Sequence, residues 1–150
     1  MKIKVSDYIC QNLKRLTGSK DVFLLSGGGM MHLLDSLSRS NLNPIPMHHE
    51  QAAAIAAYAN GRAKNTVGIC FATSGPGATN AITGVAAAFT DSVPMIIISG
   101  QVSTASSQNK LKIRQLGFQE FNIIETIKPT TKYARYISNK NDIKSIIFII

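Results

Sequence analysis

Three apolar runs in this sequence each end at a turn that contains glycine. The runs are Asp21–Leu25, Val67–Ala72 and Pro94–Ser99, and the turns contain Gly27–Gly29, Gly75–Gly77 and Gly100. Continuous apolar runs are typical of parallel strands covered on both faces. Helix-forming sequence separates them, so the pattern predicts an α/β fold, a doubly wound and mostly parallel sheet with helices on both faces and flavodoxin-like layering.

The remaining elements follow from periodicity and from residues that begin or end helices. We expect helices over Val5–Leu16, Met30–Leu37, Glu50–Lys64, about 81–90 and Phe118–Ile127, an edge strand over Pro44–His48, a strand over Thr130–Ile137 and a polar loop over Gln101–Gln115. The sequence stops on five apolar residues, Ile146–Ile150. Since an exposed apolar tail favours aggregation, we expect residues 1–150 to be one incomplete domain, truncated at its C-terminal end.

Composition excludes several classes of protein. The net charge is +8, but each half of the chain carries eight basic and four acidic side chains, so no basic arm predicts nucleic-acid binding. Cys10 and Cys70 lie in apolar runs without the spacing of a metal or redox motif, which predicts two buried, reduced thiols. We find neither a signal peptide nor a membrane-spanning stretch, and we expect a soluble, cytoplasmic protein without membrane contact.

The glycine turns mark where a ligand would bind. Ligands of open parallel sheets bind beyond the carboxyl ends of the strands, where these turns lie. Glycine there lets backbone approach a ligand, but it also makes a tight corner, and both interpretations stay open. Gly75–Asn80 nearly matches a dinucleotide-binding fingerprint, although Asn80 stands where a glycine is expected.

Glu50 is the only acidic residue between Asp35 and Asp91. A carboxylate at the start of a helix is either a charge favoured by the helix dipole or a desolvated catalytic acid. His48 and His49 precede it, but adjacent histidines point apart in regular structure, so we predict no metal site.

Taken together, these segments resemble the N-terminal, pyrimidine-binding domain of the acetolactate synthase-like thiamine diphosphate enzymes. The resemblance lies in His49–Ala54 with Tyr58–Ala63, in Thr73–Asn80 continuing to Asp91–Pro94 and Ser99–Gln101, and in Phe118–Glu120 with Lys128–Lys132. Order and spacing agree from about residue 5 to residue 137.

The resemblance implies a thiamine diphosphate-binding fold and a mechanism. Glu50 would hydrogen-bond a ring nitrogen of the aminopyrimidine and promote the imino tautomer that removes the thiazolium proton. The whole enzyme would decarboxylate a 2-oxo acid and transfer or release the acyl-anion equivalent. The other residues that the resemblance implicates are Gly27 and Gly28 near the reaction centre, Pro76 and Asn80 in the pyrimidine pocket, and Phe118 and Gln119 facing the substrate.

Some family features are changed or missing. Ser26, Gly29 and His32 differ from the synthase pattern, so the 2-oxo acid is left open. The family's Gly-Asp-Gly motif, which holds diphosphate and Mg²⁺, does not occur in these 150 residues. The isolated chain is therefore expected to be inactive, and its other half would come from deleted sequence in a homodimer or homotetramer, or from a second subunit. FAD is undecided, because its domain would lie beyond residue 150.

Two alternatives remain. A short natural chain would fit the small subunit of a split 2-oxo acid decarboxylase of the sulfopyruvate or phosphonopyruvate type. A chain that has kept the fold and lost the chemistry would be a non-catalytic α/β binding module.

Overall fold

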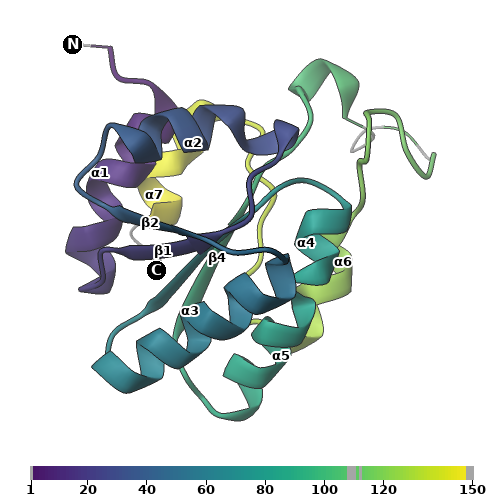
Figure 1. The fold of residues 1–150 in the computed structure, drawn as a ribbon. Coiled ribbons are helices and arrows are strands. Elements are labelled where there is room, and N and C mark those ends of the chain that lie inside the picture. The colour runs from purple at the N-terminus through teal and green to yellow at the C-terminus, as the bar shows by residue number, and fades with distance from the viewer. Residues whose placement is uncertain (1, 108–110, 112, 148–150) are drawn as a thin grey trace.

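A computed structural model describes residues 2–107, 111 and 113–147, and it contains a single sheet in which every paired strand is parallel. The strands are β1 (Asp21–Leu24), β2 (Asn43–Pro46), β3 (Gly68–Ala72) and β4 (Met95–Ser99). Their order across the sheet is β2-β1-β3-β4 (Figure 1). The predicted doubly wound α/β class is confirmed.

Helices cover both faces of this sheet. The α-helices are α1 (Val5–Thr17), α2 (Met31–Ser38), α3 (Glu50–Lys64), α4 (Pro76–Asn80), α5 (Ile82–Thr90), α6 (Ile123–Ile127) and α7 (Ile143–Ile147). Short 3₁₀ helices cover Gly28–Met30, Thr104–Ser106, Lys128–Thr130 and Lys140–Asp142. In Figure 1, α1, α2 and α7 lie on one side of the sheet, and α3 and α5 lie on the other.

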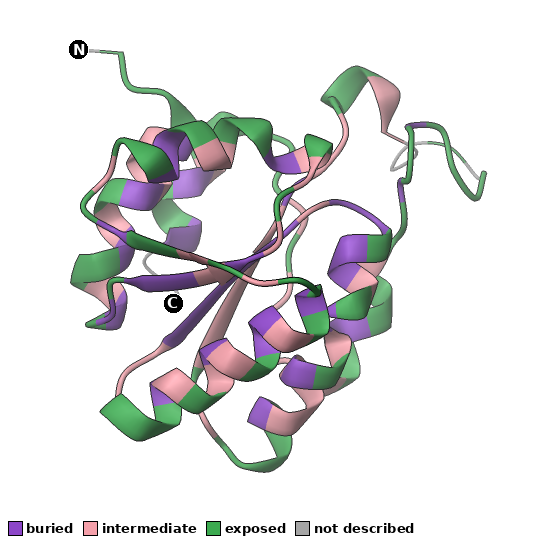
Figure 2. Ribbon diagram, in the orientation of Figure 1, coloured by how far each residue is buried: buried purple, intermediate pink, exposed green. Residues whose placement is uncertain are grey.

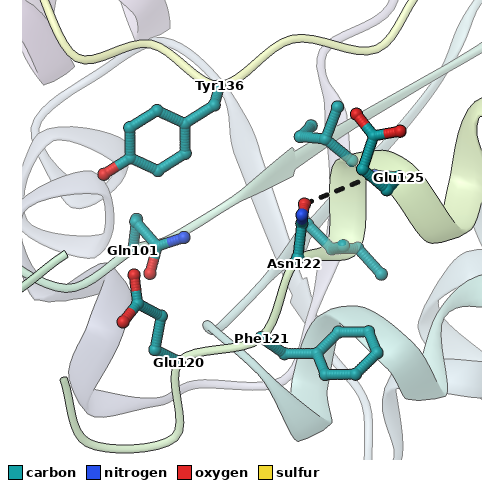
Figure 3. Close-up of a pocket in the computed structure, with 8 residues that line it drawn as sticks. Gln101, Glu120, Phe121, Asn122, Glu125 and Tyr136 are labelled. Carbon is teal, nitrogen blue, oxygen red and sulfur yellow. Dashed lines mark hydrogen bonds between the residues drawn. The ribbon is translucent and has the colours of Figure 1, made fainter. Parts of the chain in front are cut away.

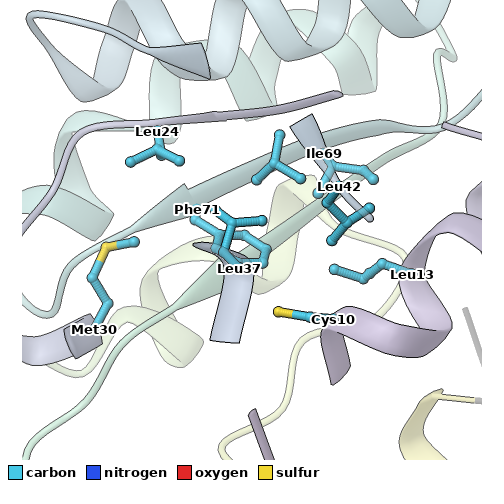
Figure 4. Packing of buried hydrophobic residues seen from close by; sticks show 9 residues of the cluster. Cys10, Leu13, Leu24, Met30, Leu37, Leu42, Ile69 and Phe71 are labelled. Carbon is cyan, nitrogen blue, oxygen red and sulfur yellow. The ribbon is translucent and has the colours of Figure 1, made fainter. Parts of the chain in front are cut away.

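The two faces of the sheet bury different kinds of side chain, because successive residues of a strand point to opposite faces. Toward α1 and α2, large side chains form the main cluster, which Figure 4 shows around Phe71. Toward α3, the cluster consists of small residues, Ala53, Ala54 and Ala57 among them. Small residues let α3 lie close to the sheet, and this places the first residue of α3 near the strand ends.

Burial differs between the strands that were expected to be covered on both faces. All five residues of β3 are buried, whereas all five of β4 are half-buried (Figure 2). β3 lies between β1 and β4, and β4 is the last strand of the sheet among the described residues.

Asp21 anchors the edge of the sheet at which the strands begin. Its buried carboxylate accepts hydrogen bonds from Asn43 (2.9 Å) and Asn60 (3.3 Å), and it forms an ion pair with Lys64. The contact with Lys64, followed by that with Asn43, lowers the pKa of Asp21 to about 2. This network joins β1, β2 and the last turns of α3 at the edge opposite the glycine turns.

Two predictions from the C-terminal third were wrong. Thr130–Ile137 forms no strand: residues 131–139 are irregular, and Tyr133 and Ile137 are exposed rather than packed on β4. The helix expected over Phe118–Ile127 begins only at Ile123. Gln119 has a φ of +57°, which no right-handed helix allows, so residues 118 and 119 form a turn instead and residues 120–122 are irregular.

Smaller differences concern element ends. α4 already begins at Pro76, inside the stretch expected to be a turn, as suits a proline whose fixed φ fits the first helical position. The apolar end of the chain is helical over Ile143–Ile147, and its last residues, 148–150, lie outside the described part.

Candidate functional site

The three glycine turns meet at the carboxyl ends of the strands. The backbone N–H of Gly29 donates to the Thr73 hydroxyl across 3.1 Å. A Cβ built on Gly100 would lie 2.2 Å from the backbone oxygen of Gly29. The turns after β1, β3 and β4 thus lie at the carboxyl ends of the strands, as the sequence predicted, and the structure shows that they are in direct contact.

Gly27 and Gly28 are glycines for different reasons. A Cβ on Gly27 would lie 2.5 Å from the Cβ of Thr73, so packing between two turns accounts for this glycine. Gly28 is exposed, has no positive φ, and a Cβ there would meet nothing within 4 Å. Neither a tight corner nor packing requires glycine at position 28, and this leaves its backbone open to close approach by a ligand.

Glu50 is the first residue of α3 and is buried, with 6% of its surface exposed. The preceding residue, His49, caps the helix: its Nδ1 accepts a hydrogen bond from the backbone N–H of Gln51 at 3.1 Å. Charged groups are rarely buried without a compensating partner. The carboxylate of Glu50 accepts one hydrogen bond from a side chain, the Asn80 amide, at 3.0 Å.

The short helix α4 brings Pro76, Gly77 and Asn80 to this carboxylate. Asn80 and Pro76 are exposed at the two ends of α4. Between them, a Cβ on Gly77 would come within 3.0 Å of Glu50 Oε1 and 2.6 Å of Thr73. Any larger residue at position 77 would crowd the carboxylate, so glycine keeps one side of Glu50 free of side-chain atoms.

Phe118 and Gln119 reach the same edge of the sheet from a distant part of the chain. A Cβ on Gly75 would lie 1.8 Å from the backbone oxygen of Gln119, so the turn after β3 and the 118–119 segment are in contact only because residue 75 is glycine. Phe118 is 82% exposed. An aromatic side chain this exposed beside a glycine turn suits contact with a ligand.

Two residues that were not predicted as site residues, Thr73 and Glu120, also help to build the site. Thr73 is contacted by both Gly27 and Gly29, and its position directly after a buried strand was the signal available. Glu120 is buried at 6% exposure and binds backbone amides beside Phe118. An acidic residue within an otherwise apolar and amide-containing motif was the signal for Glu120.

Both cysteine thiols lie in the interior of the protein. Burial, and secondarily the charge of Glu50, raises the pKa of the Cys70 thiol to about 12. Cys10 and Cys70 are both buried and free, as predicted.

In residues 2–107, 111 and 113–147 there is no group of three or more His, Cys, Asp or Glu side chains that could hold a metal ion. None of the helices in the same part of the chain is long and apolar enough to cross a membrane.

Comparison with known proteins agrees with this arrangement. Residues 3–126 match the family model described as the thiamine pyrophosphate enzyme, N-terminal TPP binding domain. The chain is 42% identical to the acetolactate synthase large subunit of Cyanidium caldarium over 132 residues, which are 85% of this chain and 22% of the relative.

Similar values hold for relatives from a plant and a bacterium. Acetolactate synthase 2, chloroplastic, of Zea mays is 40% identical over 96% of this chain. Acetolactate synthase isozyme 3 large subunit of Escherichia coli is 37% identical over 87%. The chain spans about a fifth of the length of these relatives, 22% in each case. The fold, the buried Glu50 and the family match lead to one conclusion: this chain belongs to the thiamine pyrophosphate enzymes and carries their N-terminal TPP-binding domain.

Proposed function

We propose that residues 1–150 form the pyrimidine-binding domain of an acetolactate synthase-like enzyme that decarboxylates a 2-oxo acid and transfers or releases the resulting acyl-anion equivalent. The observation that carries this proposal is the buried carboxylate of Glu50 at the carboxyl edge of the sheet, beside Gly77 and Asn80. The names of the relatives supply the reaction class.

The residues present fit an aminopyrimidine ring. A ring nitrogen needs a hydrogen-bonding partner held away from water, and Glu50 provides one. A flat ring also needs backbone without side chains around it, and Gly28 provides this, because a Cβ there would meet nothing within 4 Å. The ring would therefore be held by Glu50, by the backbone of the glycine turns, and by Pro76 and Asn80 of α4.

The cofactor, when bound, supplies a site that accepts the electron pair released by decarboxylation. The chain's own residues prepare it. Glu50 holds or gives up a proton at the ring nitrogen, and Asn80 orients Glu50 through the 3.0 Å hydrogen bond. Gly27 and Gly28 line the approach to the reacting carbon, and Phe118 and Gln119 face the 2-oxo acid.

The remainder of the site belongs to sequence that these 150 residues do not include. We infer that the diphosphate and a Mg²⁺ ion are bound by a separate domain, in a homodimer, in a homotetramer or from a second subunit. The relatives, of which this chain covers about a fifth, have ample length for such a domain.

The test uses the full-length protein with thiamine diphosphate and Mg²⁺. We expect release of CO₂ from at least one member of a 2-oxo acid panel, and exchange of the thiazolium C2 proton for deuterium, followed by NMR after acid quench. Glu50→Gln removes the group that shares the proton and should slow this exchange by about 100-fold, within the usual range for general acid and base catalysis.

Glu125→Gln serves as the control for loss of a carboxylate. Glu125 is an exposed residue of α6 that pairs with Lys128 on its own helix end. Equal exchange rates in Glu50→Gln and Glu125→Gln would contradict the role of Glu50. A wild-type protein that binds no thiamine diphosphate would leave the fold as a non-catalytic module.

A further inference from the structure

The side chain of Glu120 binds backbone groups next to Phe118 and Gln119. Its buried carboxylate accepts hydrogen bonds from the backbone N–H groups of Leu116 (3.1 Å) and Gly117 (3.2 Å) and from the Ser107 hydroxyl (2.9 Å). Hydrogen bonds to a carboxylate are roughly twice as strong as those between neutral groups. The carboxylate therefore fixes the turn 116–120 from within and also ties it to residue 107.

The turn is also held from outside, at two glycines. A Cβ on Gly117 would lie 2.6 Å from Val102 and 2.8 Å from the Ser106 oxygen, so the turn packs on the segment after β4. On the other side, the Gln119 oxygen touches Gly75. A turn clamped at both ends can hold a residue in a backbone conformation that it would otherwise avoid, and Gln119 has a φ of +57°.

Glu120 faces a pocket behind this turn. Figure 3 shows Tyr136, Gln101 and Glu120 along one side of the pocket, with Asn122 and Glu125 on the other. None of these residues is a candidate site residue. The two backbone partners of Glu120, residues 116 and 117, directly precede the exposed Phe118.

We propose that Glu120 is the positioning residue of the substrate loop: its carboxylate holds the turn 116–120 so that Phe118 and Gln119 lie over the 2-oxo acid. This inference rests on the proposed function, since it assumes that the 2-oxo acid binds at that edge. In this proposal, Glu50 activates the cofactor, and Glu120 positions the loop that contacts the substrate.

Two substitutions distinguish positioning from charge. In Glu120→Gln the amide oxygen still accepts both backbone N–H groups, and the amide NH₂ donates to the Ser107 hydroxyl, which can rotate to accept. Glu120→Ala removes every acceptor and leaves the N–H of buried Gly117 unpaired. The alanine variant should therefore release the turn, and the glutamine variant should largely preserve it.

The experiment measures steady-state decarboxylation and C2-proton exchange in the full-length protein. We expect Glu120→Ala to raise KM at least tenfold and to lower kcat/KM by about 100-fold, the loss typical of groups displaced by about 1 Å. C2 exchange should stay within about twofold of wild type, because Glu50 and Asn80 are untouched. Glu120→Gln should keep KM within about threefold of wild type, and Glu125→Ala, on the exposed side of α6, should match wild type.

Several outcomes would overturn the inference. Wild-type KM in a folded Glu120→Ala variant shows that the turn needs no such anchor, and parallel loss of C2 exchange and substrate binding shows a general structural role. If Glu120→Ala does not fold, Ser107→Ala replaces it: a raised KM with normal C2 exchange supports the inference, and an unchanged KM overturns it. A wild-type protein that releases no CO₂ overturns the proposed function itself, and this inference falls with it.

Discussion

Replacing Gly75 by alanine should push the segment with Phe118 and Gln119 away from the turn after β3, and it removes no polar group. Gly75 has φ +59° and ψ −114°, a conformation open to glycine and rarely to other residues. The added Cβ would lie 1.8 Å from the oxygen and 2.9 Å from the carbonyl carbon of Gln119. Both contacts are with backbone, so a change of rotamer cannot relieve them, and the turn that contains Gln119 must withdraw by more than an ångström.

The substitution should lower both the stability of the protein and its activity, and the two effects are measured separately. The backbone conformation alone costs about 1–2 kcal/mol when a side chain is present, which lowers the thermal midpoint of the full-length protein. Displacement of Phe118 and Gln119 by about 1 Å should lower kcat/KM for decarboxylation by roughly 100-fold. Exchange of the C2 proton should change far less, because Glu50 is not displaced by the clash.

Gly18→Ala is the matched control. Gly18 ends α1 with φ +71°, but a Cβ there meets only Thr66, at an ordinary 3.7 Å. Gly18→Ala therefore places a side chain at a positive φ, in the left-handed helical region, at a helix end remote from the glycine turns. We expect a loss of stability of about 1 kcal/mol and unchanged kcat/KM. Indistinguishable kcat/KM values in the two variants would refute the reasoning that the contact between Gly75 and Gln119 sets the position of the substrate loop.

Two further substitutions test the assignments at the two edges of the sheet. The Cβ of Gly28→Ala would meet no protein atom, so the thermal midpoint should be unchanged, but thiamine diphosphate binding should weaken about tenfold because the ligand approaches this backbone. Unchanged affinity in titration calorimetry would show that no ligand approaches Gly28. Asp21 has its pKa lowered from 3.8 to about 2, so it stabilises the folded state above pH 4, by roughly 2 kcal/mol, and this contribution is lost as the pH falls toward 2. Asp21→Asn should therefore flatten the pH dependence of amide hydrogen exchange in β1 between pH 5 and pH 2, and a profile parallel to wild type would contradict this.

The sequence was sufficient wherever a local pattern and the packing agreed. Glu50–Lys64 is a helix with the predicted ends, because an alanine-rich segment has high helix propensity and small residues are also what the sheet face accepts. The parallel sheet and the position of the three glycine turns at the carboxyl ends of its strands were also predicted. These features depend on short stretches of sequence whose preferences agree with the fold.

The sequence pattern gave wrong predictions where contacts between distant parts of the chain determine the local structure. A strand was expected over Thr130–Ile137, but a strand needs a partner, and among the described residues the sheet ends at β4. The start of α6 is delayed because the carboxylate of Glu120 binds the amides of residues 116 and 117 and shapes a turn there. Likewise, the requirement for glycine at position 27 depends on Thr73, which is distant in sequence and adjacent in space.

Each of the two edges of the sheet contains a buried carboxylate, and the two carboxylates differ in the number of partners that compensate their charge. At the amino edge, Asp21 has two amide donors and a lysine, and these contacts more than offset the cost of its burial. At the carboxyl edge, Glu50 is equally buried and has the Asn80 amide as its hydrogen-bond partner, with a bare glycine at its other oxygen. A buried charge with little compensation opposes folding. Glu50→Gln should therefore leave the fold at least as stable as wild type while removing cofactor activation, the pair of effects expected when a charge is retained for what it binds.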